Sequence, residues 1–371
     1  MSPTEIDEMC LQLTNMCPLR CMHCSTRGGA RAPSEMSDSD IQRLISDFAM
    51  IGGKVVELSG GEPLVHPSLD AFVATAAGLA LEVRLYSSGV VAFKDGAAAP
   101  PSASRWTELH RAGLSKVFFN LQAEIGTLHD FITRIPGSYV SVLESIRFAK
   151  QAGLYVGVHF VPMAPNFNHI EETYRLASSL AVDEFAVLRL VLQGRAADNR
   201  TSLALTQGEH FEVLRRALRL EKATGNVRVR LGCPFNHRLI LEPGSMAPSC
   251  RAGEAVCHVR PNGDIVPCSG LQHGGIVLGN VRFSSLAREW QSNRAWSAFR
   301  DARSQGPVPG SAEFIHLKGD PCLAQLAATG SPGKPQLRAS YEASEEETDE
   351  LLTGPQPREP AKRPLAVIVA R

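Results

Sequence analysis

Three cysteines in a short span are the first residues of this sequence that could do chemistry. Cys17, Cys21 and Cys24 stand in the segment LTNMCPLRCMHCSTRGG, with three residues between the first pair and two between the second. This spacing lets three thiolates converge on one small group from a single loop. Cysteine thiolate is the usual ligand of iron–sulfur clusters, and a four-iron cluster held by three thiolates keeps one iron open. An open metal position is typical of a catalytic site.

Two other interpretations of this triplet remain open from the residues alone. The thiolates could form a zinc site with His23 as the fourth ligand, or they could be free thiols. His23 lies between two of the cysteines, which makes its ligation to the same ion sterically awkward. The spacing therefore favours the cluster but does not exclude zinc.

Small and polar residues lie at, or just after, the ends of the next three predicted strands. In Ser59-Gly60-Gly61-Glu62-Pro63, glycines allow the backbone to approach a ligand closely, and a carboxylate follows at once. By itself this stretch could be an ordinary turn between a strand and a helix. The further polar residues at this edge are Ser87, Ser88, Asn120 and Gln122. Asn120 and Gln122 are two residues apart and so share a face of their strand.

Alternating apolar and amphipathic runs predict the elements that position these residues. Runs rich in Val, Leu, Phe and Ile predict buried strands at Met9–Thr14, Lys54–Ser59, Leu81–Ser87, Lys116–Gln122, Leu154–Val161 and Phe185–Val191. Amphipathic runs predict helices at Ser37–Ile51, Pro67–Leu79, Ser102–Ala112, Ser138–Ala152, Ile170–Leu180 and Thr206–Ala223. Six strand–helix units in a row imply an α/β fold with a parallel sheet, either open or curled into a partial barrel. Ligands then gather at the carboxyl ends of the strands.

Beyond about residue 226 the helical periodicity fades, and Cys, Pro and Gly become frequent. Four further cysteines lie here, at Cys250, Cys257, Cys268 and Cys322. His258–Arg260 and Ile265–Pro267 predict a hairpin with an Asn-Gly turn, and Ser285–Arg300 predicts one helix. Four cysteines near a hairpin could form a closed zinc site or remain structural thiols. The proline-rich and acidic end predicts disorder, so the expected units are 1–230, 231–328 and a tail at 329–371.

Composition excludes several classes of protein. The chain has 371 residues with 38 Lys+Arg and 38 Asp+Glu, so its net charge is zero. That balance argues against nucleic acid or an anionic membrane as the main partner. The sequence contains no long uninterrupted apolar run and begins with no secretory signal, which predicts a cytoplasmic protein. In a reducing compartment nine cysteines indicate metal or redox chemistry more than disulfides.

The motifs CPLRCMHC and SGGEPL resemble the signature of the radical SAM superfamily. The resemblance implies a partial (βα)6 TIM-like barrel in which Cys17, Cys21 and Cys24 hold a 4Fe–4S cluster. S-adenosylmethionine would chelate the open iron, and one electron would cleave it to a 5′-deoxyadenosyl radical that abstracts hydrogen from a substrate. The residues implied to contact this cofactor are His23, Gly60, Gly61, Glu62, Ser87, Ser88, Asn120, Gln122 and Arg189. The family often carries Ser-x-Asp where this chain has Asn120-Leu121-Gln122.

The second cysteine set resembles the SPASM and twitch domains that follow the barrel in many of these enzymes. CRAG and the hairpin HVRPNGDIVPC carry this resemblance. It implies that Cys250, Cys257, Cys268 and Cys322 bind one auxiliary 4Fe–4S cluster. The sequence after Cys322 contains no further cysteine, so a second auxiliary cluster is not expected. Cys10 and Cys233 are expected to be structural thiols.

Three residues are candidates for contact with the substrate. His159 is predicted to point into the barrel, Arg189 could pair a carboxylate, and Glu124 could transfer a proton. The first hypothesis is an oxidoreductase or lyase that acts on a nucleoside or sugar in antibiotic biosynthesis. The alternative is a maturase that crosslinks or oxidises a ribosomally made peptide. A non-catalytic metal-binding protein is a third reading, which the open-iron motif opposes. The resemblance also implies a flavodoxin- or ferredoxin-type electron donor.

Overall fold

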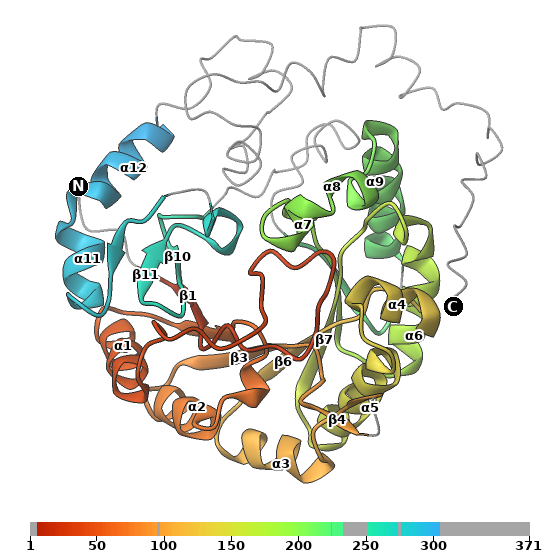
Figure 1. Ribbon diagram of the computed structural model, residues 1–371, viewed down its shortest axis with the longest axis horizontal. Coiled ribbons are helices and arrows are strands. Elements are labelled where there is room, and N and C mark those ends of the chain that lie inside the picture. Colours follow the sequence, from red (N-terminus) through yellow and green to blue (C-terminus); the bar gives the residue numbers. More distant parts are fainter. Residues whose placement is uncertain (1–5, 95–96, 224, 233–250, 274–275, 305–371) are drawn as a thin grey trace, which may run out of the picture.

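The fold is known from a computed structural model that describes residues 6–94, 97–223, 225–232, 251–273 and 276–304. Cys233, Cys250, Cys322 and the expected tail at 329–371 lie outside the described residues. Within them, parallel strands form a curved sheet, and helices cover its outer face (Figure 1).

All six predicted barrel strands are present, and neighbouring strands pair in parallel. In order across the sheet they are β1 (Glu8–Gln12), β2 (Val55–Ser59), β3 (Glu82–Ser87), β6 (Lys116–Asn120), β7 (Tyr155–Phe160) and β8 (Glu184–Val187). A seventh parallel strand, β9 (Arg228–Leu231), pairs with β8 and was not predicted. Its sequence, Arg-Val-Arg-Leu, is too short and too charged to resemble a buried strand. The predicted partial barrel is confirmed.

The helices between these strands also lie close to their predicted positions. They are α1 (Asp38–Met50), α2 (Leu69–Gly78), α3 (Ala103–Arg111), α5 (Ser138–Gln151), α6 (Ile170–Ser179) and α9 (Gln207–Lys222). In α1, Ser37 and Asp40 form a capping box, and the buried residues recur at helical spacing. Gly52, Gly113 and Gly153 follow their helices with φ values of 90°, 108° and 85°. Glycine adopts this left-handed backbone without strain, so each helix can end there and turn toward the next strand.

Several short elements in the connections were not predicted. They are η1 (Pro63–Val65), β4 (Ala92–Lys94), β5 (Ala97–Ala99), α4 (Gly126–Thr133), η2 (Phe167–His169), α7 (Arg195–Asp198) and α8 (Arg200–Leu203). All of them lie within loops of the barrel. Helices α7 and α8 follow β8 and bring residues near 195 back toward the sequence that follows β1.

The two faces of the barrel sheet differ in chemistry. Side chains that point to the helices, such as Met9, Leu58 and Leu85, are fully buried in the main hydrophobic core. The alternate residues face inward, where the rings of Tyr86 and Phe118 stack with centroids 5.2 Å apart. The Tyr86 hydroxyl donates a hydrogen bond to Glu57, and burial followed by the nearby Glu8 raises the pKa of Glu57 to about 8. The interior is therefore polar and aromatic below the strand ends.

The cysteine-rich region continues the barrel sheet. Strand β10 (Val256–Val259) pairs in parallel with β1, and β11 (Asp264–Val266) and β12 (Gly279–Asn280) follow in antiparallel order. The predicted hairpin is thus present, with Gly263 at φ 87° in its turn. Cys257 lies in β10, and the N-terminal cysteine triplet follows β1, the strand next to it in the sheet.

The expectation of one helix over Ser285–Arg300 was wrong. The structure has α11 (Leu286–Ser292) and α12 (Arg294–Ser304), separated at Asn293. The Asn293 side chain accepts a hydrogen bond from Ala295 N and donates one to Leu278 O, each at 2.9 Å. Asparagine favours such local bonds, which interrupt helical periodicity.

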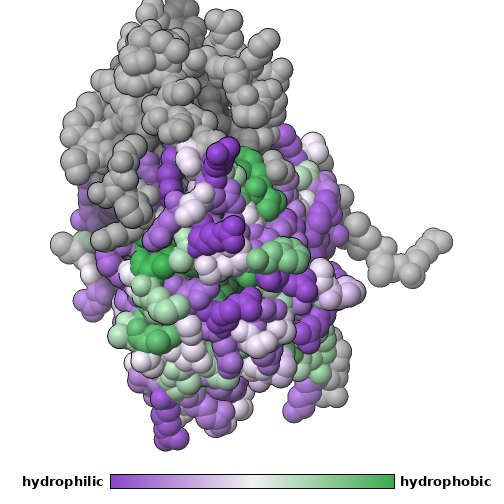
Figure 2. All heavy atoms as spheres, turned by 90° about the vertical axis from the view of Figure 1, so that its left-hand side faces the viewer, coloured by the Kyte–Doolittle hydropathy of each residue, from purple (hydrophilic) through white to green (hydrophobic). Residues whose placement is uncertain are grey.

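None of the helices in the described ranges is long and apolar enough to cross a membrane. The face shown in Figure 2 is mostly hydrophilic and carries separate apolar spots. Such isolated apolar residues are normal on the surface of a globular protein.

Candidate active site

The segment Cys17–Gly29, called the cluster loop below, begins shortly after β1 and is held at both ends. Cys17 N donates to Gly29 O at 2.9 Å, and Gly29 N donates to Asn15 O at 2.7 Å. In its middle, Met22 N donates to Ile132 O of α4 at 2.9 Å. Backbone hydrogen bonds therefore shape the loop independently of any ligand.

The three cysteines of the cluster loop lie close enough to influence one another electrostatically. Burial, together with the charges of Glu62 and Cys24, raises the pKa of Cys17 to about 12. Burial also raises the pKa of Cys21 well above its usual value, with Cys17 and Cys24 adding to the effect. Cysteine binds metal as the deprotonated thiolate. Because burial disfavours that charged form, the three sulfurs need a positively charged group among them. An iron–sulfur core supplies that charge, and the donor set fits it.

The Gly60–Gly61 turn after β2 packs directly on the backbone that leads into the cluster loop. Gly61 N donates to Thr14 O at 2.7 Å, and Glu62 N donates to Met16 O at 2.8 Å. A β-carbon at Gly60 would lie 2.5 Å from Thr14 O, and one at Gly61 would lie 2.6 Å from Asn15 O. The glycines were expected to admit a ligand. The structure shows that they admit the neighbouring backbone of the protein, and their contact with a cofactor stays a prediction.

Glu62 is fully buried and holds the end of β3. Its carboxylate accepts hydrogen bonds from Ser87 Oγ at 2.8 Å, Ser88 N at 2.7 Å and Ser88 Oγ at 2.5 Å. Burial raises the pKa of Glu62, and the hydrogen bonds from Ser88 and Ser87 lower it. The hydrogen bonds recorded for this carboxylate come from neutral hydroxyl and amide groups, so the site is suited to an ammonium group. The methionyl amine of S-adenosylmethionine fits this requirement.

Three other predicted residues lie around the strand ends. His23 has a buried Nδ1 without a hydrogen-bond partner in the described part of the chain, and burial followed by Arg195 lowers its pKa to about 4. Asn120 and His159 are register partners on β6 and β7. The His159 ring stacks on Phe118 with centroids 5.0 Å apart, and burial and then Arg230 lower the pKa of His159 to about 3. A neutral His159 therefore faces inward, as predicted, while its role stays a prediction.

Gln122 was predicted to contact the cofactor, but its recorded contacts are with the protein. The strand ends at Asn120, and the Gln122 side chain accepts a hydrogen bond from Val161 N at 3.1 Å. Asn166 Nδ2 donates to Gln122 O at 2.8 Å. These bonds join the ends of β6 and β7, so a cofactor contact of Gln122 stays a prediction.

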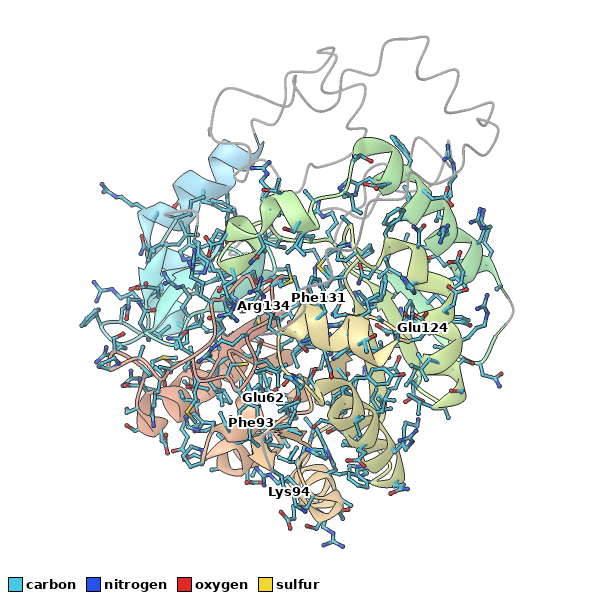
Figure 3. All side chains as sticks on the ribbon, turned by 45° about the vertical axis from the view of Figure 1, so that its right-hand side comes forward. Glu62, Phe93, Lys94, Glu124, Phe131 and Arg134 are labelled. Atoms are coloured by element: carbon cyan, nitrogen blue, oxygen red, sulfur yellow. The ribbon has the colours of Figure 1, made fainter. Side chains whose placement is uncertain are left out.

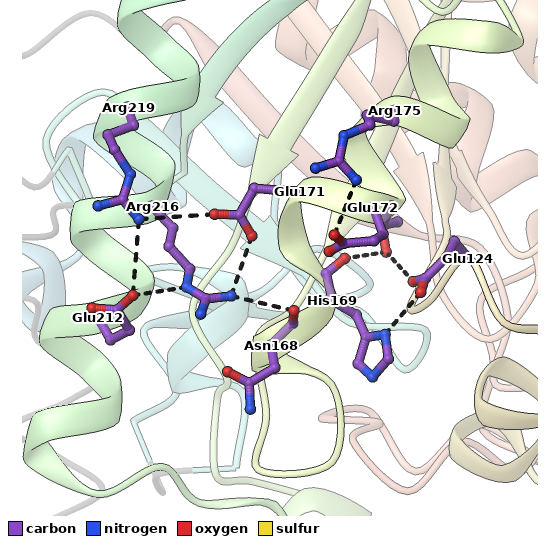
Figure 4. A network of polar contacts seen from close by, with 10 residues as sticks. Glu124, Asn168, His169, Glu171, Glu172, Arg175, Glu212, Arg216 and Arg219 are labelled. Carbon is purple, nitrogen blue, oxygen red and sulfur yellow. Dashed lines mark hydrogen bonds and ion pairs between the residues drawn. The ribbon is translucent and has the colours of Figure 1, made fainter. Parts of the chain in front are cut away.

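Glu124, the predicted proton-transfer residue, joins helix α6 to the rim. Its Oε1 lies 2.8 Å from His169 Nδ1, and Thr173 Oγ1 donates to its Oε2 at 3.3 Å (Figure 4). Glu62 and Glu124 come from different parts of the rim (Figure 3). These contacts give Glu124 a structural task, and its catalytic role stays a prediction.

Arg189 was expected inside the sixth barrel strand, but β8 ends at Val187. Burial is the largest cause that lowers the pKa of His210, and the charge of Arg189 is the second. Arg189 therefore lies near α9, the helix that contains His210. Its binding role stays a prediction. Arg195 follows on the same rim. Its Nε donates to Cys21 O at 3.0 Å, and its Nη1 donates to Gly28 O at 2.7 Å.

Two of the four predicted auxiliary ligands lie among the described residues. Cys257 is fully buried in the main hydrophobic core, and burial raises its pKa. Cys268 is partly buried and packs against Leu271. No group of three His, Cys, Asp or Glu side chains among the described residues could hold a single metal ion. The assignment of these cysteines to one cluster stays a prediction.

Glutamine side chains connect the cluster loop with residues 257–273, which carry Cys257 and Cys268 and are called the auxiliary segment below. Gln12 Nε2 donates to Gln272 Oε1 at 2.9 Å, and Gln272 Nε2 donates to Ser25 Oγ at 3.3 Å. Gln193 donates to Gly270 O and accepts a hydrogen bond from His273 N. A small polar cavity of about 100 Å³ adjoins this contact, and its lining includes Gln12, Gln272 and Arg260. The two cysteine-bearing segments are therefore structurally coupled.

Family comparisons agree with this arrangement. Residues 11–177 match the radical SAM superfamily, and residues 250–311 match the SPASM iron–sulfur cluster-binding domain. The chain belongs to the radical SAM superfamily and carries a SPASM domain after its barrel. Its cofactors are accordingly S-adenosylmethionine and 4Fe–4S clusters.

Two curated relatives and one solved structure match most of the chain. The AdoMet-dependent heme synthase of Oleidesulfovibrio alaskensis is 23% identical over 325 residues, which cover 83% of this chain and 80% of the relative. The PqqA peptide cyclase of Rhodopseudomonas palustris is 28% identical over 329 residues, covering 86% and 82%. Streptococcus suis SuiB bound to S-adenosylmethionine superposes with a TM-score of 0.69 at 15% identity, covering 88% and 76%. The likeness to SuiB shows the fold alone.

Gly61→Ala is expected to separate the Gly60–Gly61 turn from the cluster loop. The added methyl group meets backbone oxygens, so we expect a loss of about 1–3 kcal/mol in the free energy of unfolding. S-adenosylmethionine cleavage should fall as well. Gly78→Ala is the matched control, because its added methyl group meets nothing within 4 Å. Chemical denaturation and a cleavage assay measure both effects. Equal behaviour of the two variants would contradict the proposed packing role.

Glu62→Gln is expected to weaken S-adenosylmethionine binding by roughly 10–100-fold, because a hydrogen bond to a charged group is worth about 1.5–3 kcal/mol. Calorimetric titration of the reconstituted protein under anaerobic conditions measures the affinity. Wild-type affinity should fall as the pH drops through the raised pKa of Glu62, since protonation removes the negative charge. The variant should lack this pH dependence.

Glu35→Gln is the matched control for that experiment. Glu35 is a second buried carboxylate beside the cluster loop, and it accepts a hydrogen bond from Asn15 N at 2.8 Å. Its variant should keep wild-type affinity. If Glu35→Gln weakens binding as much as Glu62→Gln does, the charge of Glu62 has no specific role.

Proposed function

We propose that this protein is a radical SAM maturase that oxidatively modifies a ribosomally made peptide, by a crosslink or an oxidation. The observation that carries the proposal is the similarity to the PqqA peptide cyclase, which spans 86% of this chain. Its 28% identity exceeds the 23% shared with the heme synthase. SuiB, which shares the fold, has also been solved with its precursor peptide SuiA.

This proposal takes the alternative of the two substrate hypotheses. The first hypothesis, a nucleoside or sugar in antibiotic biosynthesis, finds no support among these relatives, whose names refer to a peptide and to heme. An electron donor of the flavodoxin or ferredoxin type remains part of the proposal. So does the assignment of Glu124, His159 and Arg189 to the substrate side.

The residues of the site have separate tasks in this function. Cys17, Cys21 and Cys24 would hold the catalytic cluster, and Glu62 would hold the amine of S-adenosylmethionine. Together these cofactors supply a 5′-deoxyadenosyl radical when they are bound and reduced. The remaining tasks of the protein are to position the substrate carbon and to exclude water. The buried, neutral His159 packs with Tyr86 and Phe118 in an aromatic layer below the strand ends, which supports both tasks.

The catalytic cluster is tested by Cys21→Ala. Wild-type protein reconstituted without oxygen should hold about eight irons if both four-iron clusters form, and the variant about four. Reduced wild-type protein should release 5′-deoxyadenosine from S-adenosylmethionine, and the variant should not. Ser46→Ala, which alters an exposed hydroxyl on α1, is the control and should behave as wild type. Release of 5′-deoxyadenosine by Cys21→Ala would refute the assignment of the catalytic cluster.

The substrate class is tested first by reading the genes beside this one, where we expect a short open reading frame for the precursor peptide, and then with that peptide as substrate. Incubation with reduced enzyme and S-adenosylmethionine should yield a peptide lighter by the mass of the hydrogens removed. An iron porphyrin with propionate side chains is the competing substrate in a parallel reaction. Mass spectrometry reads both products. Turnover of the porphyrin with an unchanged peptide would overturn the proposal and favour a heme-type decarboxylation.

A further inference from the structure

The segment Gln193–Arg195, which follows β8, lies against the cluster loop, and its cationic side chain is Arg195. Arg195 N donates to Cys24 O at 2.9 Å, beside the side-chain bonds to Cys21 O and Gly28 O. One residue thus binds carbonyl groups from both arms of the loop. Since a guanidinium presents several donors in a fixed plane, it can set the spacing of those carbonyls.

Gly194 makes this approach possible. It has φ 57°, and an added β-carbon would lie 2.5 Å from Ser25 O and 2.7 Å from Cys24 O. The backbone therefore touches the cluster loop at the last cysteine. On the other side, Gln193 binds Gly270 and His273 of the auxiliary segment. Three consecutive residues hold two cysteine-bearing segments at once.

The positive charge of Arg195 acts on the cysteine sulfurs. No ion pair recorded for the described residues includes Arg195, whose side-chain bonds go to carbonyl oxygens. These bonds to Cys21 O and Gly28 O hold its charge against the loop that carries the three cysteines. A half-buried cation is less screened than one on the surface, so the charge reaches a group held among these sulfurs.

We propose that Arg195 is a positioning residue for the catalytic cluster, which fixes the cluster loop through its carbonyl groups and favours the reduced cluster through its charge. Reduction adds one electron from an external low-potential donor, and the fixed cation stabilises the added negative charge. Net charge and hydrogen bonding near a cluster are known to set its potential. The inference concerns cofactor reduction and holds whatever the substrate is.

The test compares Arg195→Met, Arg195→Lys and Arg27→Gln. Methionine removes the charge and the hydrogen bonds, whereas lysine keeps the charge and loses the planar fork. Arg27→Gln is the matched control, since it removes another arginine of the cluster loop that pairs with Asp198 at the surface. Each protein is reconstituted, and its clusters are titrated by electron paramagnetic resonance. Titrations with and without S-adenosylmethionine assign the signals, because the cofactor binds only at the open iron.

Arg195→Met should lower the equilibrium constant for reduction of the catalytic cluster by about tenfold, which corresponds to ~59 mV for a one-electron couple. Arg195→Lys should shift it less, and Arg27→Gln should leave it unchanged. A potential for Arg195→Met equal to that of Arg27→Gln would overturn the proposal.

If Arg195→Met does not take up iron, hydrogen exchange and the reduction potential of Arg195→Lys test the proposal instead. Hydrogen exchange across Cys17–Gly29 should be faster in Arg195→Lys than in Arg27→Gln, because the fork that holds Cys21 and Gly28 is lost. If exchange and potential in Arg195→Lys both match the wild type, Arg195 does not position the loop.

Discussion

The site depends on a close contact between two backbones. The chain after β1 and the chain after β2 approach so closely that a side chain at Gly60 or Gly61 would overlap carbonyl oxygens of residues 14–16. Parallel strands bring their carboxyl ends to one edge, but they do not by themselves press two loops together. Here two amide–carbonyl bonds complete the contact. The cysteines and Glu62 are brought together because this contact leaves them no freedom to separate.

The burial of ionisable side chains explains why the cluster loop and Glu62 need cofactors. Burial raises the pKa values of Cys17, Cys21 and Glu62, so the protein by itself disfavours the charged forms that bind. A metal cluster and a cationic ligand reverse this, and each stabilises the residues that hold the other. Binding and local order are therefore coupled at this end of the barrel. Ion pairs at the opposite end of the strands, such as Glu184 with Arg230, are complete without a ligand.

The sequence predicts the six barrel strands because each is an apolar run bounded by turn residues. It predicts the catalytic motifs because their ligands are close together along the chain. It does not predict β9, whose arginines conceal a strand, or the break at Asn293. Nor does it predict the partners of Gln122 and Arg195, since their contacts join segments that are distant in sequence.

The pairing of β1 with β10 has a consequence for the order of assembly in the cell. The strand that leads into the cluster loop completes its hydrogen bonding only with a partner from the far end of the described chain. A ribosome must therefore extend the chain past β10, which ends at Val259, before β1 is enclosed on both edges. Pairing between such distant segments forms late and slowly. One edge of the strand that leads into the cluster loop is therefore completed by the segment that matches the SPASM domain, so the two domains share one sheet.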